Sequence, residues 1–261
     1  MIIKCFVGNR WNLLEKFGFI PLKQGDMFLY TYNNSYTSGA NLGDFNNDIS
    51  RETTISELLC MLEQSYTVPI VDIFDAHIKM FQKHNTQSLH KQIMHWVKII
   101  VDCVKNGNKV LIAGNGGSAA DAQHFAAELV VRFKKNRQGI PAIALTTDTS
   151  VLTAIVNDFG AIHMFSRQIV SLGKTGDIFI AISTSGNSEN VLEAIEAAQN
   201  NRMTVIALTG KDGGEIKNML TYPNIFIVNE QETGRIQEMH EFILHVIAEL
   251  VESQFPNTAV P

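Results

Sequence analysis

A glycine-rich loop and a histidine–glutamate pair are the residues of this chain best suited to chemistry. The loop spans Gly114–Ser118, and His124 and Glu128 follow it in the next predicted helix. Backbone N–H groups in such a loop can bind an anion, because few Cβ atoms shield them. A spacing of four residues places the imidazole and the carboxylate on one helix face. We therefore expect phosphate binding and acid–base chemistry to be neighbours.

A second loop, Ser183–Ser188, has four hydroxyl side chains and also lies between a predicted strand and a predicted helix. Open parallel sheets bind their ligands at such positions. Neither loop has a Walker lysine or complete Gly-x-Gly-x-x-Gly spacing, so nucleotide hydrolysis and dinucleotide binding are poorly supported. A small molecule with one phosphate fits better. The alternative, that each loop is only a turn with a helix N-cap, stays open.

The C-terminal predicted helix, residues 234–253, carries three polar side chains at steps of four along one stripe: Gln237, Glu241 and His245. Two histidines, a glutamate and a glutamine from two helices could form a nitrogen- and oxygen-ligated divalent site, with Zn²⁺ first by ligand type. For His124 and Glu128 alone, an incidental exposed ion pair is the alternative. His240 lies off the stripe, and we interpret it as structural.

Composition describes an ordinary globular chain. Its 261 residues, 45% of them hydrophobic and 18% charged, suggest one large domain or a domain with an appendage. The net charge is −5, and the densest basic run is Phe133–Arg137, so a dedicated nucleic-acid surface is not expected. We interpret that run as the cap of a solvated helix end.

Three cysteines, Cys5, Cys60 and Cys103, are odd in number and widely spaced. This argues against a disulfide framework and against a thiolate metal site. The chain shows no signal sequence and no apolar run of about eighteen residues. We expect a cytoplasmic protein without a membrane span.

From Lys109 onward, short apolar runs alternate with stretches of helical period, which is typical of parallel sheets built from βαβ units. The predicted strands are residues 109–113, 142–145, 177–182, 204–208 and 224–228. The predicted helices are 70–83, 88–105, 118–133, one or two segments within 150–172, 188–200, a short turn near 215–220, and 234–253. The fold class is therefore α/β, with a five-stranded parallel sheet covered on both faces.

The part before the first of these strands has two notable features. Helix 88–105 is so apolar that it needs a partner beyond one sheet face, and a contact between subunits would supply it. Residues 1–65 are rich in aromatics and include a polar, turn-rich stretch at 33–47 that resembles a loop or linker. We assign no function to this N-terminal segment.

The sequence resembles the sugar isomerase (SIS) family, and within it the phosphoheptose isomerases, in five motifs: Gly114–Leu129, Asn157–Gly160, Ser183–Ser188, Leu208–Gly214 and Arg235–His240. The resemblance extends from about Met61 to Phe255, in order and without large gaps. It implies a three-layer αβα sandwich, the SIS fold, at residues 66–261, preceded by helices and by an N-terminal extension at 1–65 of unknown role.

The resemblance implies an aldose–ketose isomerase. The implied reaction converts sedoheptulose 7-phosphate to D-glycero-D-manno-heptose 7-phosphate through a metal-stabilised enediolate, for bacterial surface polysaccharide. One Zn²⁺ per subunit would be held by His124, Glu128, Gln237 and His245. Glu128 would move the proton between carbons, and His245 would act at the oxygens. The implied substrate contacts are Asn115, Gly116, Gly117, Glu128, Asn157, Asp158, Ser183, Thr184, Ser185, Ser188 and Gln237.

The family also implies an assembly, a homotetramer with sites near subunit contacts. Two alternatives to the enzyme come from the same fold. One is a non-catalytic scaffold resembling the replication initiator-associating protein, in which the positions of Glu128 and His245 hold other residues, so that their presence here favours the enzyme. The other is a phosphosugar-sensing regulatory domain, for which the N-terminal segment shows no convincing DNA-binding pattern.

Overall fold

The structure, a computed structural model, describes residues 2–5, 19–24, 27–32 and 55–258, with side chains from residue 70 onward. The chain divides into two compact units, Met1–Phe74 and Asp75–Pro261, and each is described by itself. The polar stretch at 33–47 lies outside the described residues. The predicted boundary between residues 65 and 66 stays a prediction.

The first unit contains a small antiparallel sheet. Its strands are β1 (Ile2–Cys5), β2 (Phe19–Gln24) and β3 (Met27–Tyr32), in the order β1-β3-β2. Helix α2 (Ile55–His84) begins in this unit and ends in the second. None of these strands is predicted from the sequence, since the aromatic-rich segment has no clear period.

The second unit is built on a five-stranded parallel sheet, which confirms the predicted fold class. Its strands are β4 (Val110–Gly114), β5 (Ala142–Ala144), β6 (Ile178–Ser183), β7 (Thr204–Gly210) and β8 (Ile225–Val228), in the order β5-β4-β6-β7-β8. Strands β4 and β6 are buried along their whole length. Helices cover both faces, so these strands need apolar side chains at every position rather than at alternate ones.

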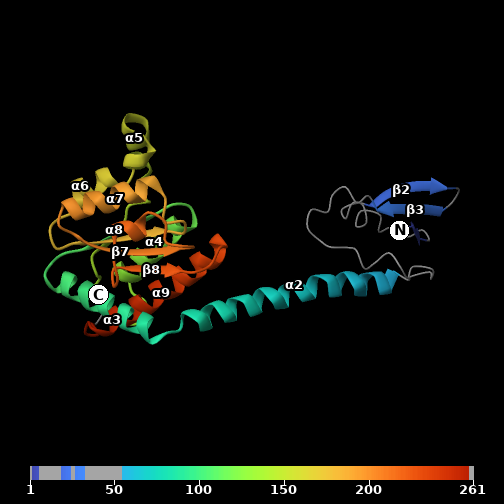
Figure 1. Ribbon diagram of the computed structural model, residues 1–261, viewed down its shortest axis with the longest axis horizontal. Coiled ribbons are helices and arrows are strands. Elements are labelled where there is room, and N and C mark those ends of the chain that lie inside the picture. Colours follow the sequence, from blue (N-terminus) through green and yellow to red (C-terminus); the bar gives the residue numbers. More distant parts are fainter. Residues whose placement is uncertain (1, 6–18, 25–26, 33–54, 259–261) are drawn as a thin grey trace. The chain divides into compact units, whose positions relative to one another are not determined.

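Helices form a layer on each side of the sheet (Figure 1). One layer contains α3 (Gln87–Lys105), α4 (Gly117–Val130) and α9 (Thr233–Ser253), which share a hydrophobic cluster with one sheet face. On the other side, α6 (Ser166–Leu172), α7 (Glu189–Asn200) and α8 (Ile216–Met219) pack with the opposite face. Helix α5 (Thr149–Phe159) and a short 3₁₀ turn, Ala161–His163, precede α6. Because α4 and α9 belong to one layer, their polar stripes can meet.

Two helix boundaries differ from the prediction. The helix predicted at 70–83 begins fifteen residues earlier, at Ile55, and ends at His84. The helix predicted to end at Phe133 ends at Val130, because the N–H groups of residues 133–135 bond to a side chain of α9. The basic run after it is not wholly solvated, since Arg137 is buried. The region 150–172, predicted to hold one or two helices, holds two, α5 and α6, which are separated at Gly160, whose φ of 90° no helix interior accommodates.

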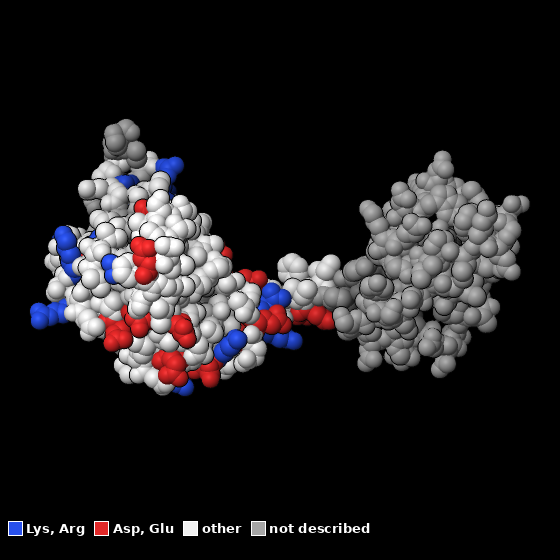
Figure 2. Space-filling model, turned by 90° about the horizontal axis from the view of Figure 1, so that it is seen from above, with Lys and Arg blue, Asp and Glu red and all other residues white. Residues whose placement is uncertain are grey.

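Charged side chains of both signs are scattered over the face of the second unit shown in Figure 2. In the described part of the chain, no helix is long and apolar enough to cross a membrane. Cys103 is buried, and burial, followed by the negative charge of Asp177, raises the pKa of its thiol to about 11. This thiol therefore stays neutral and serves as a small apolar side chain.

His240, interpreted as structural from the sequence, lies in the interior of the second unit between α9 and the sheet. Its side chain is fully buried, and its Nε2 donates to the carbonyl of Thr209 at 2.9 Å. Its Nδ1 is buried without a hydrogen-bond partner among the described residues. Burial lowers the pKa of His240 to about 4, because a protonated ring would place a charge in the apolar core, away from water.

We expect His240 to make the protein less stable in acid. At pH values between the ordinary pKa of histidine and about 4, His240 is protonated in the unfolded chain but neutral in the folded protein. The free energy of unfolding therefore falls as the pH falls through this range. The loss reaches about 3 kcal/mol at most below pH 4. Urea unfolding between pH 4 and 8 should show this slope, and His240→Gln should reduce it.

His90→Gln is the matched control, since this ring is exposed and bonds only to Asn85 among described residues. It should leave the slope unchanged. An equal slope in wild type and in His240→Gln would contradict the assignment.

Candidate active site

The two loops predicted to bind an anion lie at the carboxyl ends of adjacent strands. β4 ends at Gly114 and β6 at Ser183, and the two strands pair in parallel with Gly114 opposite Ile182. Asn115 in the first loop and Asn190 in α7 exchange two amide hydrogen bonds, of 2.9 and 3.0 Å. Both loops therefore line the sheet edge at which parallel α/β folds bind ligands.

The loop Ser183–Ser188 gathers its hydroxyl groups in a tight turn. The hydroxyls of Ser183 and Ser188 lie 3.0 Å apart, and Ser185 Oγ accepts the backbone N–H of Asn187 at 3.1 Å. Thr184 is half-buried between them. Helix α7 begins directly after this loop, so its free N–H groups and positive dipole end lie beside the hydroxyls. These are the donors that a phosphate requires.

A second group of side chains lies where α4 packs against α9. The Nε2 atoms of His124 and His245 are 2.9 Å apart, with their rings at 76° to each other. Oε1 of Glu128 lies 3.4 Å from the same Nε2 of His124. Two imidazole nitrogens thus meet, and the Glu128 carboxylate lies beside the one from His124; nitrogen and oxygen atoms of these kinds are ligands of a divalent cation.

The other two residues of the α9 stripe extend this group. Glu241, His124 and His245 each offer a ligand atom, and these atoms lie within 4.8 Å of one another. Gln237 packs on the first residue of α4, since a Cβ atom at Gly117 would lie 2.6 Å from its Cδ. The absence of a side chain at Gly117 is what allows α9 to approach the loop so closely.

Asp121 adds a carboxyl group beside this cluster. Its residue is 9% exposed, and its Oδ2 is buried without a hydrogen-bond partner among the described residues. Burial, and then the negative charge of Glu241, raise the pKa of Asp121 to about 6, against the opposing effect of His124. Several negative groups therefore surround the histidine pair, an arrangement that a bound cation would relieve.

Asn157 and Asp158, at the end of α5, contact each other. Both are exposed, and the Nδ2 of Asn157 donates to Oδ1 of Asp158 at 2.8 Å. Among the described residues, no hydrogen bond or ion pair links either of them to His124 or His245. Asn157 lines an open depression of about 330 Å³ with four other residues: Leu152, Thr153, Val156 and Met164.

Three residues near the site lie outside the predicted set. Asp121 could have been found, because it precedes His124 by one helical turn. Glu241 lies on the predicted stripe of α9 but outside the predicted ligand set. Phe133 carries no local signal, yet its ring stacks on His245 with centroids 5.6 Å apart and planes at 23°.

Residues 74–210, which include α4 and both candidate anion-binding loops, match the SIS domain, a sugar-isomerase type of domain. A phosphoheptose isomerase from Campylobacter concisus is 50% identical over 181 residues, which cover 69% of this chain and 94% of that protein. A second, from Shewanella sediminis, is 49% identical over 196 residues, 75% of this chain and 95% of that protein.

Solved structures of phosphoheptose isomerases are also similar to this chain. The phosphoheptose isomerase of Neisseria gonorrhoeae has a TM-score of 0.67 at 43% identity, covering 72% of this chain and 99% of that one. That of Francisella tularensis has a TM-score of 0.69 at 36% identity, covering 72% and 98%. The chain therefore belongs to the SIS-domain family and, within it, to the phosphoheptose isomerases. It is an enzyme of the isomerase class, and the non-catalytic scaffold is not favoured.

Proposed function

We propose that the protein converts sedoheptulose 7-phosphate to D-glycero-D-manno-heptose 7-phosphate, a cytoplasmic step toward bacterial surface polysaccharide. The relatives named above, phosphoheptose isomerases along nearly their whole length, support this substrate class. The observation that carries the proposal is the meeting of His124 with His245, 2.9 Å apart, and with Glu128, 3.4 Å away, while Gln237, on the same helix as His245, lies against Gly117 of the first candidate anion loop. Groups suited to proton transfer would thus lie near groups suited to bind the phosphate of a sugar.

The histidine pair and its neighbours have the donor set of a Zn²⁺ site. We propose that His124, His245, Glu128 and Gln237 hold one ion per subunit. The unpartnered oxygen of Asp121 and the converging nitrogen atoms support a cation at this position. When bound, Zn²⁺ would supply a Lewis acid that polarises the sugar carbonyl. Glu241 offers a second carboxylate close to both histidines. Glu128 therefore need not coordinate the ion throughout the reaction.

The protein's own side chains would then carry the proton. In the ketose, C1 is a hydroxymethyl group and C2 a carbonyl. Glu128 would remove a proton from C1 to give the enediol form and return it to C2, while His245 would move a proton between the two oxygens. The carbonyl thereby passes from C2 to C1, and no atom leaves the sugar.

The hydroxyl loop would hold the far end of the substrate. Ser183, Thr184, Ser185 and Ser188, with the N-terminal end of α7, would bind the phosphate, and the loop at Asn115, Gly116 and Gly117 would contact the sugar. Phosphate binding would position C1 and C2 beside Glu128, since the energy of a remote contact can orient a reacting end. Asn157 and Asp158, at the end of α5, would also contact the substrate. We propose a homotetramer with sites near subunit contacts.

Chelation should abolish the reaction. We expect purified full-length protein to isomerise sedoheptulose 7-phosphate, to lose activity after dialysis against a chelator, and to regain it with Zn²⁺. Product formation and metal content should be measured on the same samples. An active, metal-free protein would exclude the proposed ion, and a metal-loaded protein inactive on this sugar would exclude the proposed substrate.

The N-terminal extension should be dispensable for the reaction. All matched motifs lie beyond residue 60, so a chain beginning at Met61 is expected to keep the kcat and KM of the full chain. Steady-state kinetics on both proteins provide the measurement, with circular dichroism to show that the shortened chain is folded. A folded but inactive chain from Met61 would refute the expectation.

A further inference from the structure

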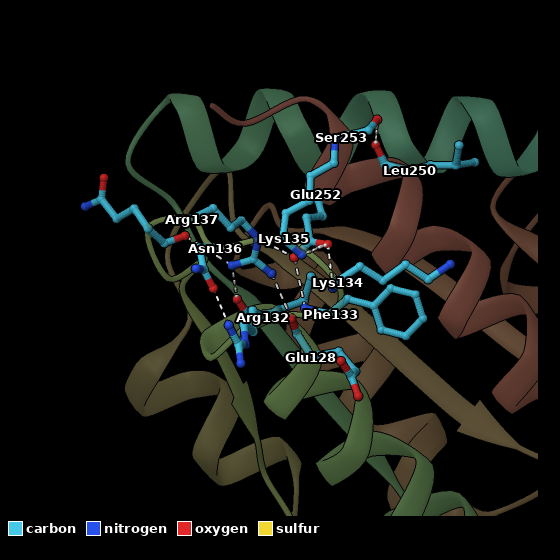
Figure 3. Close-up of polar contacts among 12 residues, drawn as sticks. Glu128, Arg132, Phe133, Lys134, Lys135, Asn136, Arg137, Leu250, Glu252 and Ser253 are labelled. Carbon is cyan, nitrogen blue, oxygen red and sulfur yellow. Dashed lines mark hydrogen bonds and ion pairs between the residues drawn. The ribbon is translucent and has the colours of Figure 1, made fainter. Parts of the chain in front are cut away.

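A buried ion pair joins the turn after α4 to the last turn of α9. Nε of Arg137 lies 3.2 Å from Oε1 of Glu252, and the two side chains are 1% and 2% exposed. The residues are far apart in the sequence, and Figure 3 shows them meeting beside the end of α4. A buried pair of this kind loses much if one partner is removed, because the other is then left charged in the interior.

Glu252 also determines the path of the turn. Its carboxylate accepts the backbone N–H groups of Phe133, Lys134 and Lys135 at 2.9, 2.7 and 2.9 Å (Figure 3). Burial alone would raise the pKa of Glu252, but these three donors and then Arg137 bring it below its ordinary value. The carboxylate is therefore charged in the folded protein and holds three successive residues of the turn against α9.

Arg137 in turn holds the end of α4. Its guanidinium donates to the carbonyls of Glu128 and Leu129, both at 2.8 Å (Figure 3). These are carbonyls of the last turn of α4, which a cation satisfies well. The backbone of Glu128 is thus tied, through Arg137, to Glu252 on the facing helix.

The same turn carries the aromatic ring that stacks on His245. Phe133 donates its backbone N–H to Glu252, and its ring lies 5.6 Å from the imidazole of His245 at an angle of 23°. Glu252 follows His245 by seven residues, two helical turns, and therefore lies on the same side of α9. One short segment is consequently anchored at Glu252 and covers His245 two turns earlier.

We propose that Phe133 is a positioning residue for His245, and that the Arg137–Glu252 pair holds its ring in place. The flat ring restricts rotation of the imidazole, so that Nε2 of His245 stays directed at Nε2 of His124, 2.9 Å away. Side chains that orient a metal ligand are commonly worth about 10- to 100-fold in metal affinity. The inference rests on the proposed function, which makes His245 a ligand of Zn²⁺.

The test is a double-mutant cycle on Zn²⁺ affinity, measured on the full chain by competition with a chromophoric chelator. We expect Phe133→Leu to bind Zn²⁺ about 10-fold more weakly and Phe133→Tyr to bind like wild type. In a His245→Ala background, Phe133→Leu should have no further effect, because the ring then has nothing to position. A merely structural role would lower affinity in both backgrounds alike.

Lys135→Ala is the matched control, because this exposed side chain lies in the same turn and the backbone N–H to Glu252 is kept. It should bind Zn²⁺ like wild type. Glu252→Gln, which retains the shape and the acceptor oxygen, should weaken binding in the same direction as Phe133→Leu. Phe133→Met replaces Phe133→Leu if circular dichroism shows that the leucine variant is unfolded.

The outcomes distinguish a failure of the positioning role of Phe133 from a failure of the proposed metal site. Wild-type Zn²⁺ affinity in Phe133→Leu, or equal losses with and without His245, would overturn the positioning role and leave the proposed function standing. A wild-type protein that isomerises the sugar but binds no Zn²⁺ would overturn the metal site and this inference together.

Discussion

Replacing Glu128 by glutamine is expected to lower kcat for sedoheptulose 7-phosphate by about two to four orders of magnitude. Glutamine has nearly the same shape but cannot accept the proton from C1. KM should change little, since the proposed phosphate contacts lie in a separate loop, Ser183–Ser188. Initial rates over a range of sugar concentrations, with the metal content of the same sample, give the measurement.

The same variant separates the two roles assigned to Glu128. Lost turnover with retained Zn²⁺ identifies the carboxylate as the base, whereas loss of both identifies it chiefly as a ligand. Glu249→Gln is the matched control, because Glu249 is an exposed carboxylate of α9 that pairs with Lys134. Full activity in Glu128→Gln would contradict the mechanism and direct the search for the base to Glu241.

Gly186→Ala is expected to reduce kcat/KM by about 100-fold through displacement of the proposed phosphate loop, Ser183–Ser188. Gly186 has φ of 67°, a left-handed conformation that alanine adopts only at a cost. Its Cβ atom would also collide with the backbone of Gly213 and Gly214, which no side-chain rotation can relieve. Kinetics with the phosphosugar, together with thermal unfolding, would measure both effects.

Gly107→Ala separates backbone strain from collision. Gly107 also has positive φ, 79°, but a Cβ atom there meets nothing within 4 Å. This variant should lose a little stability and keep its kinetic constants. Equal kinetics in the two variants would show that the contact with Gly213 does not hold the loop in its active position.

The α/β architecture could be read from the sequence because its signals are local. The runs Val110–Gly114 and Ile178–Ser183 are apolar up to their last residues, as strands covered on both faces must be. The loops after them carry the glycine and hydroxyl residues that a strand-to-helix turn at a ligand site favours. Spacing of four residues likewise brought His124 and Glu128 to one helix face.

Other features depend on contacts between distant residues and left no such signal. The end of α4 is determined by Glu252, whose carboxylate takes the N–H groups of the turn that local periodicity would have kept helical. The run Phe133–Arg137 has the composition of a solvated helix cap. Arg137 is nevertheless buried, and its guanidinium pairs with the same carboxylate. No spacing rule connects these positions.

By itself, then, the sequence determined the order of strands and helices from Lys109 onward, the two candidate anion-binding loops and the polar stripes on α4 and α9, because each follows from the composition or periodicity of a single element. Only the tertiary structure decided that the stripes face each other, that Asp121 and Glu241 adjoin the histidine pair, and that Phe133 covers His245. The physical reason is that α4 and α9 must bury their apolar faces on the same side of one sheet, and this packing sets the distances between their polar side chains.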